Sequence, residues 1–283
     1  MTIQNKTAIL VLTHKPMPYL KLLAQTNKHI NFYIHIDKKI NSNHIVGDFN
    51  DLDNVIFIKD RIIIHWAGFS MIQATLNLIK VALLNKENQF FHLISADDVL
   101  LQKIEDMNNA WQHNNPEAIY LDSKISLPHR YRLRFNAPHA DTIYQRHPIG
   151  KSLTLAFKLM DKIIPAGPSI PNLFGSQWFS IRRSQLHTLI DSITKKDYAF
   201  FSKKLCPDEH FFQYIIARTP ELYCNLATGN QRYIIFDPSY NRGSNPIFLS
   251  LDQLKKAQDQ GAWFARKVDA TLAKEALSLI YKE

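Results

Sequence analysis

Cysteine is nearly absent from this sequence, which contains only Cys206 and Cys224 in 283 residues. Two cysteines cannot form a disulfide framework, and neither stands in a CxxC pattern or at a Cys/His spacing typical of zinc sites. The sequence therefore argues against the disulfide-rich secreted classes and the cysteine-ligated zinc modules. We expect two reduced thiols in a cytoplasmic protein.

Long apolar runs, internal repeats and low-complexity stretches are also lacking. No apolar run approaches the ~20 residues with which a helix crosses a bilayer. The opening segment MTIQNKTAILVLTH has too short an apolar core for a signal peptide. Hydrophobic residues nevertheless make up 46% of the chain, which is enough for a sizeable core. We expect an ordered globular protein that stays in the cytoplasm.

Negative charge is in deficit, because 25 Asp and Glu residues face 34 Lys and Arg residues, for a net charge of +9. This excess favours an anionic partner, such as an acidic membrane or a phosphorylated small molecule. It also serves general solubility, and both interpretations stay open. Nucleic acid ranks third and is not predicted as a partner, because the chain has no recognisable nucleic-acid motif and no dense basic block.

Short apolar segments alternate with helical patterns through the first half of the chain. The segments that read as buried strands are 8–14, 32–39, 55–60, 90–98 and 118–122. A helical pattern with Ser70 as its N-cap lies between the third and the fourth of them, and Asp269 is a candidate cap for a C-terminal helix. The alternation predicts an α/β fold with a doubly wound, mostly parallel sheet flanked by helices, in a single domain.

Three of the predicted strands end in polar residues: Thr13 and His14, Asp37, and Asp97 with Asp98. A polar strand end is often only a turn signal, but three that converge on one edge favour a ligand site there. The paired aspartates could hold a divalent ion that bridges a nucleotide diphosphate. Adjacent side chains of an extended segment point to opposite faces, however, so a metal site is the less favoured interpretation.

The second half is less regular, and residues 137–171 are rich in proline, histidine and basic residues. Within them, 151–164 has an amphipathic helical pattern, in which apolar residues from Leu153 to Ile164 share one face. Lys151, Lys158 and Lys162 lie largely opposite. Such a basic amphipathic helix can lie on an anionic membrane, but we favour packing against its own domain.

The segment CPDEHFF (206–212) places two adjacent carboxylates behind a proline. Asp208 and Glu209 could simply favour a helix N-terminus. Alternatively, one of them could take the proton of an acceptor hydroxyl as a new bond forms. Composition does not separate these two interpretations.

Cations that could neutralise a leaving diphosphate without a metal lie late in the chain. They are Arg232, Arg242, Arg266 and Lys267. Each alone is typical of a surface, but FARK (264–267) follows Trp263 and includes Phe264, which indicates a packed segment that would hold a cation in place.

Seven segments, in order, resemble signatures of glycosyltransferase family 14, the core 2 / I-branching N-acetylglucosaminyltransferases, whose wider family includes peptide O-xylosyltransferases. They are AILVLTHKP, FYIHIDKK, HWAGFSMIQATLNLI, FHLISADDVLL, GSQWFSIRR, PDEHFFQYII and GAWFARKVD. The resemblance spans almost all of the chain. It implies a GT-A fold, an inverting mechanism, and a UDP-sugar donor used without a metal or other cofactor.

The resemblance also implies residue roles. Glu209 matches the catalytic base. Lys267 matches one diphosphate-binding cation, and Arg242 matches the other if a small gap is allowed. Asp37 matches the acid that contacts the nucleoside, beside Val11 and Thr13. The residues expected at the donor and acceptor pocket are Asp98, Trp178 and Phe236, with Phe236 in place of the family's Trp.

The chain departs from the animal enzymes, which carry a membrane anchor and several disulfides. We therefore predict a bacterial, cytoplasmic member that builds surface polysaccharide or lipooligosaccharide, with a glycan acceptor that can be lipid-linked and a peripheral contact at the inner membrane. One domain is expected over 1–283, with a nucleotide-binding half (1–122) and an acceptor-side half (123–283).

N-acetylglucosamine is the favoured donor sugar. The alternatives are another UDP-sugar, such as UDP-xylose or UDP-glucose, a metal-dependent transferase, and a protein that binds a sugar nucleotide or a glycan without turnover. The sequence does not define the linkage or the oligomeric state.

Overall fold

The centre of the molecule is a six-stranded sheet with the strand order β3-β2-β1-β4-β9-β6. The computed structural model describes residues 6–165, 172–239 and 245–281. The strands of this sheet are β1 (Lys6–Thr13), β2 (Asn31–Ile36), β3 (Val55–Phe57), β4 (Asn88–Ser95), β6 (Tyr120–Leu121) and β9 (Phe179–Arg182). The first four are parallel, and β9 is antiparallel to both β4 and β6. The predicted mostly parallel sheet is confirmed.

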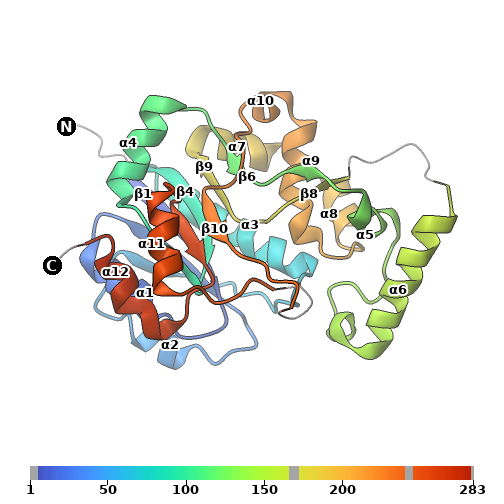
Figure 1. Ribbon diagram of the computed structural model, residues 1–283, viewed down its shortest axis with the longest axis horizontal. Helices are drawn as coiled ribbons and strands as arrows, with labels where there is room; N and C mark the ends of the chain where they lie inside the picture. The colour runs from blue at the N-terminus through green and yellow to red at the C-terminus, as the bar shows by residue number, and fades with distance from the viewer. Residues whose placement is uncertain (1–5, 166–171, 240–244, 282–283) are drawn as a thin grey trace.

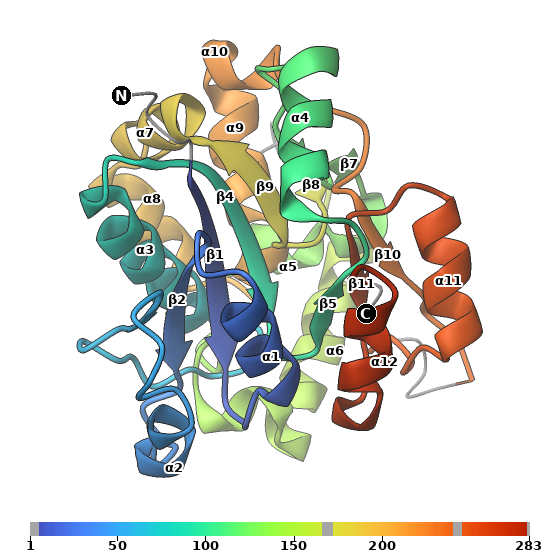
Figure 2. The same ribbon diagram turned by 90° about the vertical axis from the view of Figure 1, so that its left-hand side faces the viewer.

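Helices cover both faces of this sheet, as Figures 1 and 2 show. The core on one face includes residues of α1 (Pro18–Thr26), α2 (Asn43–Gly47) and α4 (Ile104–Asn114), and it continues into α11 (Leu251–Asp259) and α12 (Ala273–Ser278). The other face packs against α3 (Phe69–Leu84), α7 (Arg183–Asp191), α8 (Lys195–Phe201), α9 (Phe211–Arg218) and α10 (Pro220–Tyr223). Both faces of the parallel strands are therefore buried, which explains their continuous apolar sequences.

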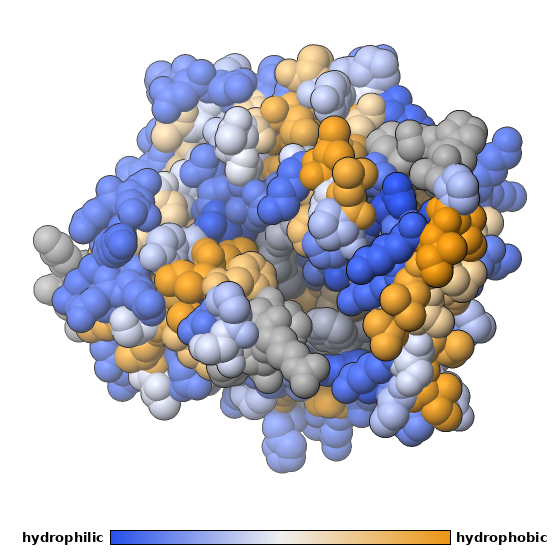
Figure 3. All heavy atoms as spheres, turned by 45° about the vertical axis from the view of Figure 1, so that its right-hand side comes forward, coloured by the Kyte–Doolittle hydropathy of each residue, from blue (hydrophilic) through white to orange (hydrophobic). Residues whose placement is uncertain are grey.

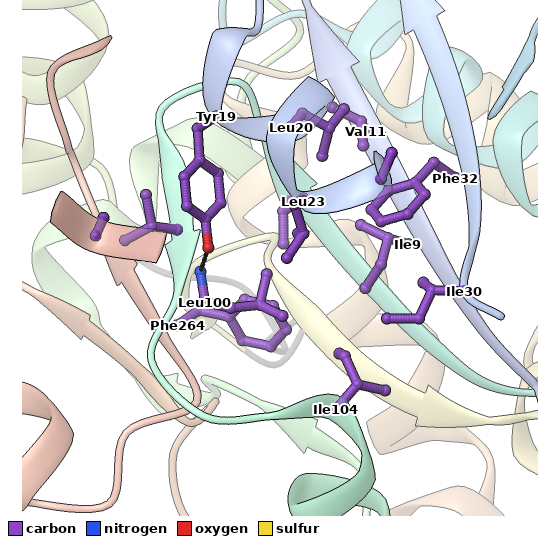
Figure 4. Close-up of a cluster of buried hydrophobic side chains, with 14 of the residues drawn as sticks. Ile9, Val11, Tyr19, Leu20, Leu23, Ile30, Phe32, Leu100, Ile104 and Phe264 are labelled. Carbon is purple, nitrogen blue, oxygen red and sulfur yellow. Dashed lines mark hydrogen bonds between the residues drawn. The ribbon is translucent and has the colours of Figure 1, made fainter. Parts of the chain in front are cut away.

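Alternate side chains of β1 enter two different cores. Ile9 and Val11 belong to the cluster beneath α1, whereas Leu10 belongs to the cluster beneath α3. Figure 4 shows the first cluster, in which the Tyr19 hydroxyl accepts a hydrogen bond from the Leu100 backbone N–H at 3.0 Å. Complete burial of each large apolar side chain contributes about 1.5–3 kcal/mol, so these clusters fix the strands whose ends form the site.

A second sheet, with the order β10-β11-β5, joins the two halves of the sequence. It contains β5 (Asp98–Leu100), β10 (Arg232–Ile234) and β11 (Phe264–Arg266). Strand β11 is antiparallel to β5, with Arg266 opposite Asp98. This pairing brings the late basic segment to the end of β4.

The remaining elements lie mainly around the less regular part of the chain. They are β7 (Lys124–Ile125), β8 (Leu173–Phe174), α5 (Tyr131–Arg134), α6 (Pro148–Ile163), η1 (Leu127–His129), η2 (Ile143–Arg146), η3 (Pro207–Glu209) and η5 (Ala270–Leu272). The Asp269 side chain accepts a hydrogen bond from the Thr271 N–H at the start of η5, directly before α12, which confirms the predicted cap.

Two local expectations are wrong. The N-cap of α3 is Gly68, not Ser70, because the Ser70 hydroxyl donates instead to the Asp141 carboxylate. Helix α6 does not bury its apolar face against its own domain, since Leu155, Leu159 and most of its other large apolar side chains are exposed. In Figure 1 this helix stands at one end of the molecule, away from the central sheet.

Among the helices of the described residues, none combines the length and apolar character needed to cross a membrane.

Candidate functional site

A cavity of about 910 Å³ is lined by segments that are far apart in the sequence. These are 66–71, 122–124, 174–178, 208–209, 226–236, 245–246 and 260–267, in each case through some of the residues of the range. The face shown in Figure 3 is hollowed near its centre. This volume is in the range of sites for small organic ligands, and four residues of the predicted site line it: Trp178, Glu209, Phe236 and Lys267.

Glu209 enters the cavity from η3, a single turn that follows Cys206 in the left-handed region (φ 47°). The Glu209 backbone carbonyl accepts a hydrogen bond from the Gly175 N–H at 3.0 Å. Its side chain is 35% exposed, and the Arg132 guanidinium donates a hydrogen bond to the carboxylate. The carboxylate is therefore oriented by one cation and is still accessible to a ligand, as a general base must be.

Asp208 has a different environment from its neighbour. Burial, reinforced by the Glu209 charge, raises the pKa of Asp208 to about 7. Its Oδ1 atom is buried and has no hydrogen-bond partner among the residues that the structure describes. Helix α9 begins only at Phe211 and has no side-chain cap, so neither carboxylate caps it. Both acids lie instead in the first turn of η3, directly behind Pro207, so the interpretation as partners of a helix start holds for that short turn.

The basic segment at the end of β11 contributes two cations to the cavity wall. Arg266 donates to both Asp98 carboxylate oxygens, at 3.0 and 2.9 Å, and its guanidinium lies 4.4 Å from the centroid of the Trp178 ring. Lys267 is held more loosely, with Nζ 3.8 Å from Asp97 Oδ2. Burial lowers the pKa of Lys267, and the Asp97 charge raises it in part. Lys267 is therefore the more available of the two for a ligand.

Arg232 lines the same cavity, but its donors are occupied by the protein. Its guanidinium donates to the carbonyls of Phe179 at 2.6 Å and Leu93 at 3.2 Å, and to the Ser180 hydroxyl at 3.1 Å. Burial lowers the pKa of Arg232 to about 9, so it remains mainly charged at neutral pH. Arg232 joins β4 to β9 and adds positive potential to the wall.

The residues predicted to contact the nucleoside, Val11, Thr13 and Asp37, are not among the residues that line this cavity. The Asp37 carboxylate is buried and accepts from the N–H groups of Lys39 at 3.0 Å and Ile64 at 3.3 Å. The Asp37 N–H donates to the Thr13 carbonyl at 2.9 Å. Val11 is fully buried in the core, as Figure 4 shows. Their roles in nucleoside binding stay predictions.

The remaining members of the predicted site are Asp98, Arg242 and Phe236. The Asp98 carboxylate is buried and turned towards Arg266 and the Ser95 N–H, and it does not line the cavity. Arg242, the predicted second diphosphate ligand, lies outside the described residues. Phe236, by contrast, is exposed at the cavity.

The adjacent aspartates at the end of β4 engage separate cations. Asp97 pairs with Lys15 and Lys267, and Asp98 pairs with Arg266. The two carboxylates thus point to different partners, although Asp97 lies in the turn between β4 and β5 and not in the extended segment that the sequence argument assumed. In the part of the chain that the structure describes, no three His, Cys, Asp or Glu side chains group as metal ligands would.

Sequence reasoning missed Arg132 and Asp122. Asp122 lines the cavity, and burial raises its pKa. Arg132 lies in the basic run HRYRLR (129–134), which was the available signal, but its contact with Glu209 is made 77 residues further along the chain.

A family model described as "Branch: Core-2/I-Branching enzyme" matches residues 7–257. A search of the curated proteins finds no match. The matched range includes Glu209 and ends before Lys267, so the assignment of Lys267 depends on its motif and its position in the cavity. Because the family model covers most of the chain, this protein belongs to the Core-2/I-Branching enzyme family and is a glycosyltransferase, a class that uses a sugar-nucleotide donor and a glycan acceptor.

Proposed function

We propose that this glycosyltransferase is an inverting, metal-independent enzyme that transfers N-acetylglucosamine from UDP-N-acetylglucosamine to a glycan. We further propose that the acceptor belongs to a bacterial surface polysaccharide or lipooligosaccharide, and that the enzyme works on the cytoplasmic side of the inner membrane. The observation that carries the reaction is that one cavity contains both an accessible carboxylate, Glu209, and an incompletely paired cation, Lys267.

In the proposed reaction an acceptor hydroxyl lies beside Glu209. Its oxygen attacks the anomeric carbon of the donor sugar while the Glu209 carboxylate takes the hydroxyl proton. The bond between that carbon and the diphosphate oxygen breaks, and UDP leaves with the electron pair. Because attack comes from the face opposite UDP, the configuration at the anomeric carbon inverts.

Arg132 is a positioning residue in this proposal. Its guanidinium donates to the Glu209 carboxylate, and it also lies 5.7 Å from the centroid of the Phe174 ring at the cavity. These contacts restrict the orientation of the Glu209 side chain. The base is thus held for attack before the acceptor arrives, which lowers the entropic part of the barrier.

The donor diphosphate is assigned to Lys267, with Arg242 as the second ligand. A cation beside a leaving diphosphate stabilises the charge that grows as the bond breaks. Asp97 links Lys267 to Lys15, two residues beyond Thr13, so the basic segment is connected to the strand ends proposed for the nucleoside. Metal independence is supported by the engagement of Asp97 and Asp98 with cations of the protein.

A donor panel tests this proposal. UDP release would be measured with UDP-N-acetylglucosamine, UDP-glucose and UDP-xylose, each with a lipooligosaccharide-type acceptor and each with and without excess EDTA. We expect the highest rate with UDP-N-acetylglucosamine and little loss in EDTA. A rate that collapses in EDTA and returns with Mn²⁺ would overturn the metal-free reaction. Tight donor binding with no turnover on a panel of glycans would favour a binding protein.

A further inference from the structure

Helix α6 turns mainly polar side chains towards the domain and its apolar side chains towards solvent, which is the reverse of an ordinary surface helix. The residues that it turns towards the body of the protein are Gly150, Thr154, Phe157 and Asp161, of which only Phe157 is a large apolar side chain. Thr154 forms a hydrogen bond with His139 at 2.9 Å. Asp161 accepts from Arg130 at 2.9 Å and from Arg134 at 3.1 Å. Polar contacts and one aromatic ring therefore attach this helix to the domain.

The apolar side chains of α6 face solvent instead. The exposed fractions are 60% for Ile149, 57% for Leu155, 51% for Leu159, 39% for Met160 and 80% for Ile163. The preceding turn extends this surface with Ile143 and Tyr144, which are also more than half exposed. In Figure 3 hydrophobic residues form a band along the side of the molecule where α6 lies. An apolar patch of this extent indicates an interaction surface.

Positive charge borders this apolar surface. Lys151, Lys158 and Lys162 are exposed along one edge of the helix, between the apolar arc and the side that packs on the domain. The only acid in α6 is Asp161, which is buried and paired with arginines. The accessible part of α6 is thus apolar and basic, with no negative charge.

We propose that α6 is a membrane-docking helix that lies on an anionic lipid surface. An apolar arc flanked by lysines fits the boundary between acyl chains and anionic headgroups. A second copy of this chain fits less well, because two α6 helices would bring lysines together without an acid to pair them. The net charge of +9 opposes self-association in the same way.

The docking helix lies next to the proposed reaction site. Arg146, in η2 just before α6, lies 4.8 Å from the centroid of the Trp66 ring, and Trp66 lines the cavity. Helix α5 contacts α6 through Arg134, as does the preceding Arg130, and α5 also carries the Glu209 partner Arg132. If the proposed function holds, docking brings the cavity close to a lipid-linked acceptor. The docking surface itself does not depend on that function.

Vesicle cosedimentation tests the proposal with the full chain. The wild type should bind phosphatidylcholine vesicles that contain phosphatidylglycerol, bind them less well at high salt, and bind pure phosphatidylcholine weakly. Leu159→Ser with Ile163→Ser should lose binding. Lys151→Glu with Lys162→Glu should weaken binding to the anionic vesicles by at least roughly tenfold.

Matched controls change the same residue types elsewhere. Leu84→Ser alters an exposed leucine at the end of α3, and Lys255→Glu with Lys256→Glu reverses two exposed charges on α11. Both should bind vesicles like the wild type. The proposal is overturned if the wild type stays in solution, if the controls lose binding as much as the α6 variants, or if the α6 changes instead dissociate a dimer. UDP affinity, measured on the same variants, should not change, so failure here is separable from failure of the proposed reaction.

Discussion

The two charged regions of the cavity differ in how firmly the protein holds them. Arg232 and Arg266 are fixed by several hydrogen bonds each, and both lie against aromatic rings. The Glu209 side chain pairs with Arg132 alone among the described residues, and a third of this side chain is exposed. In the proposed reaction, the fixed arginines would supply positive potential around Lys267, the assigned diphosphate ligand, and the Glu209 region would stay open to an incoming acceptor.

The largest effect is expected at the open region. Glu209→Gln removes the proton acceptor and keeps nearly the same shape, so turnover should fall by roughly 10²–10⁴-fold. UDP affinity should stay close to that of the wild type, because the side chain is assigned to the acceptor. Turnover and UDP binding measured on one preparation check this. Asp208→Asn is the matched control and should lose less turnover, and full activity of Glu209→Gln would place the base elsewhere.

A change at Arg232 tests the firmly held basic wall, by its effect on the free energy of unfolding. Arg232→Met would leave the Phe179 and Leu93 carbonyls without their donor, and the free energy of unfolding should fall by about 3 kcal/mol. Chemical denaturation measures this loss. Lys267→Met is the comparison, and it should be much less destabilising because the Lys267 side chain has, within the described residues, only one long ion pair. If Arg232→Met is as stable as the wild type, the hydrogen bonds of Arg232 do not contribute to the stability of the fold.

Lys267 should matter for the ligand more than for the fold. Lys267→Ala should weaken UDP binding by roughly 10–100-fold, the range for hydrogen bonds to a charged group. Added salt should weaken UDP binding by the wild type as well. Calorimetric titration with UDP provides both measurements. If Lys267→Ala binds UDP as tightly as the wild type, Lys267 is not a ligand of the diphosphate. A comparable loss in Arg266→Ala together with unchanged affinity in Arg242→Ala would reassign the second ligand.

Asp208 should have the smallest effect on turnover, and its main effect should appear as a pH dependence of stability. Its folded-state pKa of about 7 is above the ordinary value of 3.8, so between these pH values the folded protein binds a proton that the unfolded chain has lost. Stability of the wild type should therefore fall, relative to Asp208→Asn, as pH rises from about 4 to 7, by at most ~1.4 kcal/mol per pH unit. Well above pH 7 the difference in stability between the wild type and Asp208→Asn should no longer change with pH. Melting curves of both proteins, recorded at several pH values in this range, measure the difference. A difference in stability that does not change with pH would contradict the prediction.

The central sheet could be predicted from the sequence because its signals are local. Continuous apolar segments such as 8–14 become strands buried on both faces, and helical periods lie between them. Glu209 and Lys267 could be singled out because each stands in a short motif. Local patterns and short motifs of this kind can be recognised without knowing which distant residues they contact in the fold.

Other features depend on contacts between distant residues. The pairing of Arg266 with Asp98, and the contact of Arg132 with Glu209, are set by the register of β11 on β5 and by the approach of α5 to η3. Helix α6 is a further case, because its periodicity shows that it has an apolar face and does not show which face packs on the domain. Ser70 has the sequence position of an N-cap, but its hydroxyl donates a hydrogen bond to Asp141, which is 71 residues away in the sequence.

A crystal structure with UDP, grown in the presence of Mn²⁺, tests the central division of the cavity most directly. The account predicts diphosphate oxygens within hydrogen-bond distance of Lys267 Nζ, the nucleoside near Asp37, and a Glu209 carboxylate that touches no part of UDP. It would be contradicted by a diphosphate held through Mn²⁺ on Asp97 or Asp98, or by a diphosphate bound at Arg132 beside Glu209.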